Sequence, residues 1–346
     1  MKKVLITREE FNPHPLGLCK MTTSGNITEI MQLQHKNESG TITRLNADLY
    51  IVNSTGELRE YNHTTNRAEN SAAKSRMAAS MKSVRDIINC NCTELQNCRW
   101  MTFTYAENMT DPKRLCSDRQ AFWQRVKRWH KKNELPAPEY ISICEPQGRG
   151  AWHLHELWIY PRKAPFLPNH EIAQLWQHGF VTVKKLDSCD NVGAYLTAYL
   201  CDVPLDEYDG TVRQQDIKVA EITMEDGTKT EKKLVKGARL HLYPPGMNFY
   251  RTSRGIKRPT SEWMLLHEAK EKVRGATLTY SSVVRLVDGS IATSSGEPFT
   301  NDILYEYYNS ARTSSQHNAH TVNTLQRLDA DLIPVNGPDP DDPFVR

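Results

Sequence analysis

The sequence predicts an α+β fold with a central, mainly antiparallel β-sheet flanked by helices. The first observation is the order of elements between residues 100 and 201, which is strand, helix, strand, strand, helix, strand, helix. The second is a glycine-containing turn at 148–150, which joins two of these strands as an antiparallel hairpin. The third is size, because 346 residues with 38% hydrophobic content bury one sizeable core plus appended elements. This order favours α+β over a doubly wound parallel sheet.

Residues 1–83 are expected to form a small β-rich N-terminal region that ends in a linker helix. Apolar and polar side chains alternate between 26 and 61, with turn-forming residues at 53–56, which indicates a small β-meander. Good helix formers fill 67–89, and their apolar residues lie at helical spacing. This helix leads into the central domain, which is expected at 84–209.

The central domain begins with a strand at 100–105 and a long basic helix. Asp111 and Pro112 form an N-cap and first-turn pair, and the helix they start continues to Lys132. Its apolar stripe faces the sheet, and its other faces carry a strong excess of positive charge. The basic residues include Arg119, Arg125, Lys127, Arg128 and Lys131.

The remaining elements of this domain follow at short intervals. Strands are predicted at 140–145 and 151–160, a short helix at 169–177 and a further strand at 180–186. A last helix starts at the N-cap candidate Asp190 and ends near Cys201.

Beyond the central domain, residues 210–308 are expected to form a C-terminal accessory region. A helix is predicted at 261–274 and a strand at 277–287. From residue 309 to 346 the chain is rich in Ser, Asn, His and Asp, a composition that buries too little apolar surface to fold alone. We therefore expect a disordered tail.

Composition also bears on compartment. The N-terminus lacks the apolar stretch of a signal peptide, and no run of about 18 apolar residues occurs, so we expect a cytoplasmic protein without membrane contact. Eight cysteines without paired spacing are expected to be reduced thiols. The formal net charge of +3 is too small by itself to indicate a polyanionic partner.

Two histidines form the strongest candidate for chemistry. His153 and His155 are two residues apart on a predicted strand, so both imidazoles project from one face. Glu145, near the end of the preceding hairpin strand, is the nearest plausible third ligand for a metal. Three protein ligands would leave positions open for a substrate oxygen. The competing interpretation is a pair of half-buried histidines with no ligand role.

Two tyrosines lie on the helix that follows. Tyr195 and Tyr199 are four residues apart, so they share one helix face about 6 Å apart. They could serve one reactive site, or they could simply pack against the sheet as amphipathic side chains.

Three segments in order resemble the motifs of HUH-type replication initiators, and most closely the Rep proteins of small plasmids and phages of Gram-positive bacteria. The first is Phe103-Thr104-Tyr105-Ala106-Glu107-Asn108, and the second is Glu145 with Gly150-Ala151-Trp152-His153-Leu154-His155. The third is Asn191-Val192-Gly193-Ala194-Tyr195-Leu196-Thr197-Ala198-Tyr199. The likeness covers approximately 84–202 and extends weakly to 236–259.

The resemblance implies an HUH endonuclease fold and a rolling-circle replication initiator that nicks and rejoins its origin strand. Glu145, His153 and His155 would hold a divalent metal, Mn²⁺ or Mg²⁺ before Zn²⁺. Tyr195 would attack the scissile phosphate to give a 5′-phosphotyrosine and a free 3′-hydroxyl that primes synthesis. Tyr199 is either a second nucleophile or a core residue. The implied partners are single-stranded DNA, double-stranded origin DNA, a host helicase and a DNA polymerase.

Other features remain open. Many relatives carry a lysine three residues after the nucleophile, where this chain has Ala198, so any such role is absent or supplied elsewhere, with Lys184 and Lys185 as candidates. A relaxase or transposase of the same chemistry, or a non-catalytic origin-binding protein, are the rival functions. Beside such a site two basic segments become candidate DNA contacts. Their residues are Arg125, Lys127, Arg128 and Lys131 in the long helix, and Arg251, Arg254, Lys257 and Arg258 further on.

Overall fold

The structure is a computed structural model of the chain, and two compact units make it up. It describes residues 2–7, 13–35, 42–53, 55–61, 71–147, 150–186, 191–197, 203–204, 217–223, 229–235, 239, 242–244, 247–292 and 298–312. The central unit consists of Ser24–Asn26 and Ser83–Pro259. The terminal unit consists of Met1–Thr23, Ile27–Lys82 and Thr260–Arg346, so both ends of the chain contribute to it.

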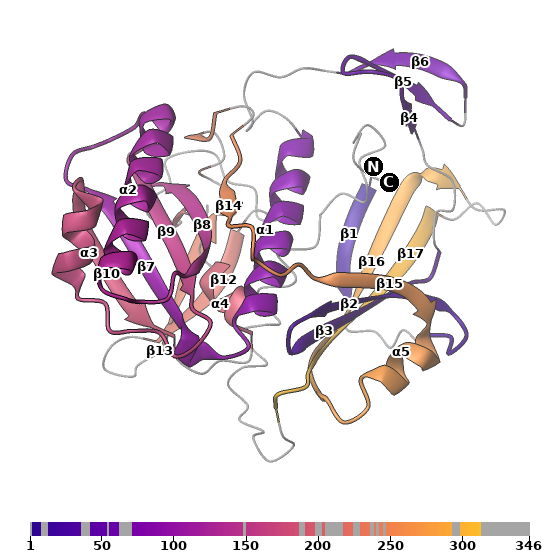
Figure 1. Cartoon of the computed structure of the whole chain (residues 1–346). Coiled ribbons are helices and arrows are strands. Elements are labelled where there is room, and N and C mark those ends of the chain that lie inside the picture. The colour runs from indigo at the N-terminus through magenta and orange to yellow at the C-terminus, as the bar shows by residue number, and fades with distance from the viewer. Residues whose placement is uncertain are drawn as a thin grey trace. The chain divides into compact units, whose positions relative to one another are not determined.

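A five-stranded antiparallel sheet forms the core of the central unit (Figure 1). This confirms the predicted α+β class and its mainly antiparallel sheet. The hairpin turn forms as expected, with Gly150 at φ 83, a conformation that favours glycine. In spatial order the strands are β10 (Gly179–Lys185), β7 (Cys98–Tyr105), β9 (Trp152–Ile159), β8 (Glu139–Pro146) and β14 (Tyr250–Thr252).

Two helices cover one side of this sheet, which we call the helix face. They are α2 (Pro112–Lys132) and α3 (Asn169–Trp176), and both begin where predicted. Asp111 caps α2 by accepting a hydrogen bond from the backbone N–H of Lys113 at 2.8 Å. The aromatic rings of Phe103, Phe122 and Trp176 pack at centroid distances of 4.9 to 5.7 Å and are fully buried.

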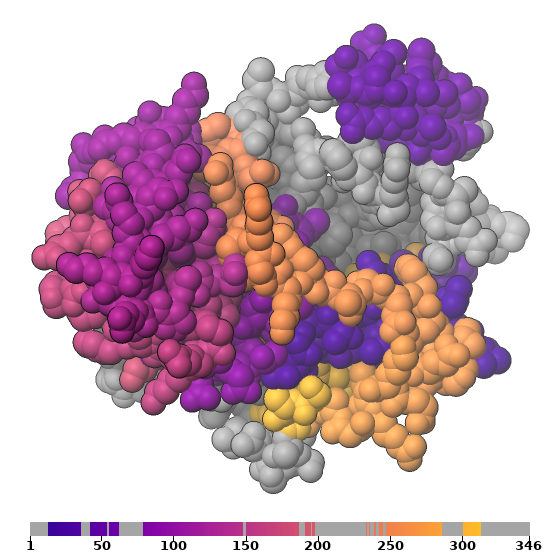
Figure 2. All heavy atoms as spheres, viewed as in Figure 1, coloured from indigo at the N-terminus to yellow at the C-terminus, as the bar shows by residue number. Residues whose placement is uncertain are grey.

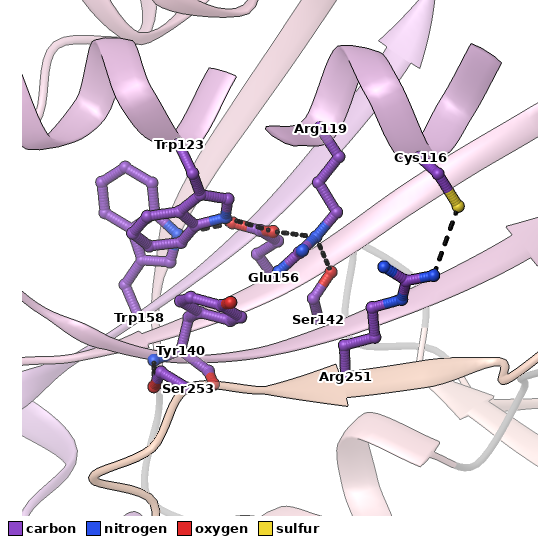
Figure 3. A network of polar contacts seen from close by, with 9 residues as sticks. All are labelled: Cys116, Arg119, Trp123, Tyr140, Ser142, Glu156, Trp158, Arg251 and Ser253. Atoms are coloured by element: carbon purple, nitrogen blue, oxygen red, sulfur yellow. Dashed lines mark hydrogen bonds and ion pairs between the residues drawn. The ribbon is translucent and has the colours of Figure 1, made fainter. Parts of the chain in front are cut away.

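A buried ion pair fixes α2 to the helix face (Figure 3). The Glu156 carboxylate has 0% exposure and accepts hydrogen bonds from Arg119 Nε at 3.1 Å, Trp123 Nε1 at 3.0 Å and Trp158 Nε1 at 2.8 Å. Arg119 Nε also donates to Ser142 Oγ at 2.7 Å. The expectation that Arg119 belongs to an exposed basic surface is therefore wrong: its charge is neutralised inside the protein.

Helix α1 (Ser71–Asn91) lies on the opposite side of the sheet from α2 and α3 (Figure 1). Its residues from Ser83 onward belong to the central unit, and Val84, Ile87 and Ile88 are fully buried. Ser83 Oγ and Tyr250 Oη are 3.2 Å apart, which ties α1 to the β14 edge. The other elements of this unit are η1 (Leu95–Asn97), α4 (Val192–Thr197) and a small sheet of β11 (Val203–Pro204), β13 (Lys229–Val235) and β12 (Ile217–Thr223).

The terminal unit contains a six-stranded sheet built from both ends of the chain. N-terminal strands pair with strands from the accessory region, so the segments expected as separate regions share one sheet. A core that includes Cys19, Ile30 and Tyr308 lies against α5 (Leu266–Lys272). The sheet order is β1 (Lys2–Thr7), β16 (Thr277–Ala292), β17 (Pro298–Asn309), β3 (Ile27–Leu33), β2 (Leu18–Ser24) and β15 (Thr260–Leu265).

Two predictions for this unit need correction. The predicted helix at 261–274 is strand β15 over its first part, because residues 260–265 pair with β2, and tertiary pairing overrides local helix propensity. The predicted meander at 26–61 is divided, because β3 joins the large sheet. A three-stranded sheet remains, with β4 (Ile42–Arg44), β5 (Leu49–Val52) and β6 (Glu57–Glu60).

The end of the chain is described as far as residue 312. Asn309 is the last residue of β17, so the expected tail begins with an ordered residue. Residues 313–346 of that tail lie outside the described residues. Among the helices that the structure describes, none is long and apolar enough to span a bilayer.

Candidate active site

Strand register brings the three predicted metal ligands together. Glu145 on β8 is the direct partner of His153 on β9, and His155 follows two residues later on the same side of the sheet. His155 Nε2 donates a hydrogen bond to Glu145 Oε2 at 2.9 Å. The two imidazole centroids are 6.3 Å apart. We call this side the histidine face; it is opposite to the helix face, where Glu156 points.

Two residues of β7 hold the His155 ring, and neither was singled out from the sequence. Thr102 Oγ1 lies 3.1 Å from His155 Nδ1. The Trp100 ring stacks on the imidazole at 5.5 Å with an interplanar angle of 10°. Since Nε2 donates to a carboxylate, the neutral ring accepts from the threonine hydroxyl at Nδ1. Strand alternation could have identified Thr102, because it is the register partner of His155.

Arg239 is a further member of the site. Its Nη1 donates to Glu145 Oε1 at 2.5 Å, and its side chain is 18% exposed. The Glu145 carboxylate therefore bridges a guanidinium on one oxygen and an imidazole on the other. Such a charge-assisted bond is strong in a partly buried place. Sequence analysis missed Arg239 because it lies 94 residues from Glu145 and belongs to no motif.

The donor set fits a divalent metal in chemistry, and two donors fit in spacing. Adjacent ligands about 2.1 Å from an octahedral ion lie roughly 3 Å apart, which matches the 2.9 Å between His155 Nε2 and Glu145 Oε2. Within the described ranges, no three His, Cys, Asp or Glu side chains already converge as a metal site. His153 is the direct neighbour of Glu145 and would have to turn toward that pair to complete it.

The predicted nucleophile lies in a short helix. Tyr195 is the fourth residue of α4, which begins at Val192. The N-cap is Asn191, whose Oδ1 accepts from the Ala194 backbone N–H at 2.9 Å; the expected cap, Asp190, lies outside the described residues. Tyr199 also lies outside them, so the choice between second nucleophile and core residue stays open.

Helix α4 is held against α1 by two buried asparagines and a glycine. Asn89 Nδ2 donates to Asn191 Oδ1 at 2.9 Å, and Asn89 Oδ1 accepts from the Gly193 backbone N–H at 2.9 Å. A Cβ at position 193 would lie closer than 3.0 Å to the carbonyl oxygen of Arg85, which is a clash. Only glycine lets the two helix backbones approach this closely. The third motif therefore contains a packing requirement beside its tyrosine.

The first motif is mostly structural. Phe103 and Tyr105 point into the helix face and are buried. Tyr105 Oη donates to Asp118 Oδ2 at 3.1 Å, and burial together with Asp118 raises the pKa of Tyr105 far above its usual value. This phenol is thus a neutral hydrogen-bond donor. Thr104 alternates to the histidine face, where it is the direct partner of His153.

The basic residues of α2 are not brought to the histidines. Their helix covers the other side of the sheet, with Lys127, Arg128 and Lys131 exposed to solvent. Arg125 donates to the carbonyl oxygens of Leu175 at 2.6 Å and Trp176 at 3.2 Å, so it holds the end of α3.

The second basic segment follows β14, where its atoms form part of the visible surface (Figure 2). Arg251, Arg254, Lys257 and Arg258 are all exposed. Arg251 Nη2 approaches Cys116 Sγ at 3.4 Å (Figure 3), and Arg258 Nη2 donates to Thr252 Oγ1 at 3.0 Å.

Comparison with known proteins adds one informative match. Residues 98–203 match the model of a family of replication-associated proteins, described by its member ORF2. The match supports a replication initiator. It begins at β7 and ends in β11, so it contains Glu145, both histidines and Tyr195 but leaves out Asn89 and Arg239.

The other comparisons carry little. No curated protein matches the chain. Among solved structures, 6-hydroxy-D-nicotine oxidase from Arthrobacter nicotinovorans is 9% identical over 83% of this chain, with a TM-score of 0.16, and the likeness carries no argument. The chain spans about half of that enzyme, 53% of its length.

Proposed function

We propose that this chain is an HUH-type rolling-circle replication initiator that nicks its origin strand through Tyr195 and later rejoins the strand. The observation that carries the proposal is the contact between Glu145 and His155, with His153 as the neighbour of that carboxylate. The family match over 98–203 supports a role in replication. The proposal includes α4, which holds Tyr195 and is anchored by the Asn89 side chain.

The proposed cofactor is a divalent cation, Mn²⁺ or Mg²⁺ before Zn²⁺, held by Glu145, His153 and His155. When bound, it supplies positive charge that polarises the scissile phosphate. Thr102 and Trp100 keep the His155 ring oriented, as a supporting residue must for a ligand imidazole. Arg239 neutralises Glu145 when no cation is present.

The proposed reaction is a transesterification. The Tyr195 oxygen forms a bond to phosphorus while the bond from phosphorus to the 3′-oxygen breaks. The phenol proton leaves the tyrosine, and the departing 3′-oxygen gains a proton, so a 5′-phosphotyrosine and a 3′-hydroxyl result. Attack by a 3′-hydroxyl on the phosphotyrosine reverses the step and rejoins DNA. The free 3′-hydroxyl would serve a host polymerase, with a helicase opening the duplex.

A cleavage assay on single-stranded origin DNA tests this function. The purified chain is incubated with the labelled strand and Mn²⁺, with Mg²⁺ and with chelator. We expect a metal-dependent nick with the 5′ fragment released and the 3′ fragment retained on protein. Glu145→Gln and His155→Ala should each reduce the rate at least about 100-fold, since such ligands are required for charge stabilisation.

The matched control is His170→Ala, which removes an exposed imidazole outside the site. Nicking unaffected by the two ligand variants would contradict the proposal. Tight origin binding without any nick would leave a non-catalytic origin-binding protein. Cleavage of a transfer origin or of element ends, in preference to the replication origin, would identify a relaxase or a transposase.

A further inference from the structure

An exposed aromatic side chain lies on the edge of the central sheet, in line with the candidate metal ligands. Phe180 on β10 is the register partner of Thr104 on β7, and Thr104 is the partner of His153 on β9. Directly paired residues project from the same side of a sheet. Phe180 therefore lies on the histidine face, two strand spacings or about 10 Å from His153.

The edge strand presents a regular pattern on this face. Phe180 is 74% exposed, and Thr182 and Lys184, which follow at two-residue steps, are also exposed. Val181, between Phe180 and Thr182, points the other way and is buried under the helices. A large apolar ring on an edge strand is unfavourable in water unless something covers it.

The surroundings of Phe180 indicate what covers it. Between the β10 edge and the histidines, the histidine face carries Thr104 and Thr102, which are partly exposed, and Trp100, whose ring leans on His155. None of these residues, nor Thr182, carries a negative charge, and Lys184 adds a positive one. An exposed ring, small hydroxyls and a cation with no carboxylate among them suit a single nucleic acid strand, whose bases stack and whose phosphates need cations.

We propose that β10 is the track for the single-stranded DNA beside the scissile phosphate, with a base stacked on Phe180 and a phosphate paired with Lys184. The inference rests on the proposed function, because it takes the scissile phosphate to lie at Glu145, His153 and His155. It also divides the two adjacent lysines. Lys184 is paired with Trp100 on the histidine face, whereas Lys185 is paired with Arg99 and projects from the opposite face.

Neighbouring residues provide matched controls. Phe166 is 82% exposed in the loop before α3, so Phe166→Ala removes an equally exposed ring away from the strand. Lys185→Gln removes the same charge as Lys184→Gln from the other face of β10. Phe180→Trp keeps a stacking surface and should restore what Phe180→Ala loses. Thermal unfolding of each variant shows that the domain is intact.

The test is the dissociation constant of a labelled single-stranded origin oligonucleotide, measured by fluorescence anisotropy at several salt concentrations. We expect Phe180→Ala to weaken binding about 5- to 150-fold, the effect of losing one stacked base, and Phe180→Trp to bind like the parent. Lys184→Gln should reduce the slope of log K against log salt by about 0.7. Phe166→Ala and Lys185→Gln should change neither quantity. Equal effects of the test and control variants would overturn the inference.

Two further readouts separate the alternatives. Adduct formation by the parent chain is measured in parallel: a parent that binds DNA but forms no adduct defeats the proposed function, whereas a parent that nicks while Phe180→Ala binds normally defeats only the track. Sedimentation of the free proteins tests the other occupant of an exposed edge, a second copy of this chain. A dimer in the parent that Phe180→Ala abolishes would also overturn the inference.

Discussion

The side chain of Asn89 accepts a hydrogen bond from the backbone N–H of Gly193 at 2.9 Å, across 104 residues of sequence. Asn89 also donates to Asn191, the N-cap of α4. One buried side chain thus satisfies a first-turn N–H of this short helix and fixes its cap. The orientation of the segment that contains Tyr195 consequently depends on α1.

Gly193→Ala tests this dependence. The added methyl group would lie closer than 3.0 Å to the Arg85 carbonyl oxygen, so α4 must move away from α1. We expect a loss of about 1–3 kcal/mol in the free energy of unfolding, the usual effect of overpacking, and a slower adduct step at saturating DNA. Chemical denaturation and single-turnover kinetics measure the two effects. An unchanged adduct rate would show that the contact does not position Tyr195.

Arg119→Met tests the buried ion pair under α2. The substitution leaves the Glu156 carboxylate, with 0% exposure, without its cation, and we expect a loss of about 3–5 kcal/mol of stability. Arg128→Met on the exposed side of the same helix is the control and should cost less than about 0.5 kcal/mol. Urea denaturation of both variants measures the difference. Similar midpoints for the two would contradict the structural role given to Arg119.

His130 gives the protein a pH-dependent stability. Its ring is 1% exposed; Nδ1 donates to the Val126 carbonyl at 2.9 Å, so the neutral Nε2 accepts from Tyr160 Oη at 3.0 Å. Burial lowers the pKa of His130 below its usual value of 6.5. Protons then bind the unfolded chain more readily, so this contribution is complete above about pH 6.5 and is lost as pH falls toward the lower folded value.

The comparison is between the parent and His130→Gln. The parent should lose stability more steeply below pH 6.5, by at most about 1.4 kcal/mol per pH unit, because one proton is linked to unfolding. Denaturation at pH 7.5, 6.5 and 5.5 measures this slope. Parallel curves for the two proteins would exclude the buried neutral imidazole.

The two basic segments should differ in what they contribute. The cations Lys127, Arg128 and Lys131 project from α2, which covers the side of the sheet away from the histidines. Replacing all three with Gln should leave adduct formation on a short single-stranded oligonucleotide within about twofold. Replacing Arg254, Lys257 and Arg258 with Gln should weaken origin binding and reduce its salt slope by about 2 to 3, roughly one unit per phosphate contact. Equal effects of the two triple variants on the short oligonucleotide would contradict this division.

Local patterns were sufficient to predict the central sheet. The hairpin of β8 and β9, the capped start of α2 and the strand position of His153 and His155 all follow from signals within a few residues. The contact of Glu145 with His155 is a consequence of that hairpin, because register places a residue of one strand beside a known residue of the other.

Long-range contacts were not predictable in the same way. Arg239 reaches Glu145 across 94 residues, and nothing in its neighbourhood distinguishes it from other exposed arginines. The pairing of β1 with β16 joins the two ends of the chain, which local periodicity does not encode. The same limit explains β15, whose partner strand β2 overrides the helical pattern of 261–265.

The most direct test of the central claim is the identity of the residue that becomes bonded to DNA. The adduct formed with single-stranded origin DNA and Mn²⁺ is digested with protease and nuclease, and the modified peptide is sequenced by mass spectrometry. The account predicts a phosphotyrosyl bond at Tyr195, and no such bond at this position in Tyr195→Phe. Metal-dependent cleavage with no adduct, or an adduct on a residue outside α4, would contradict it.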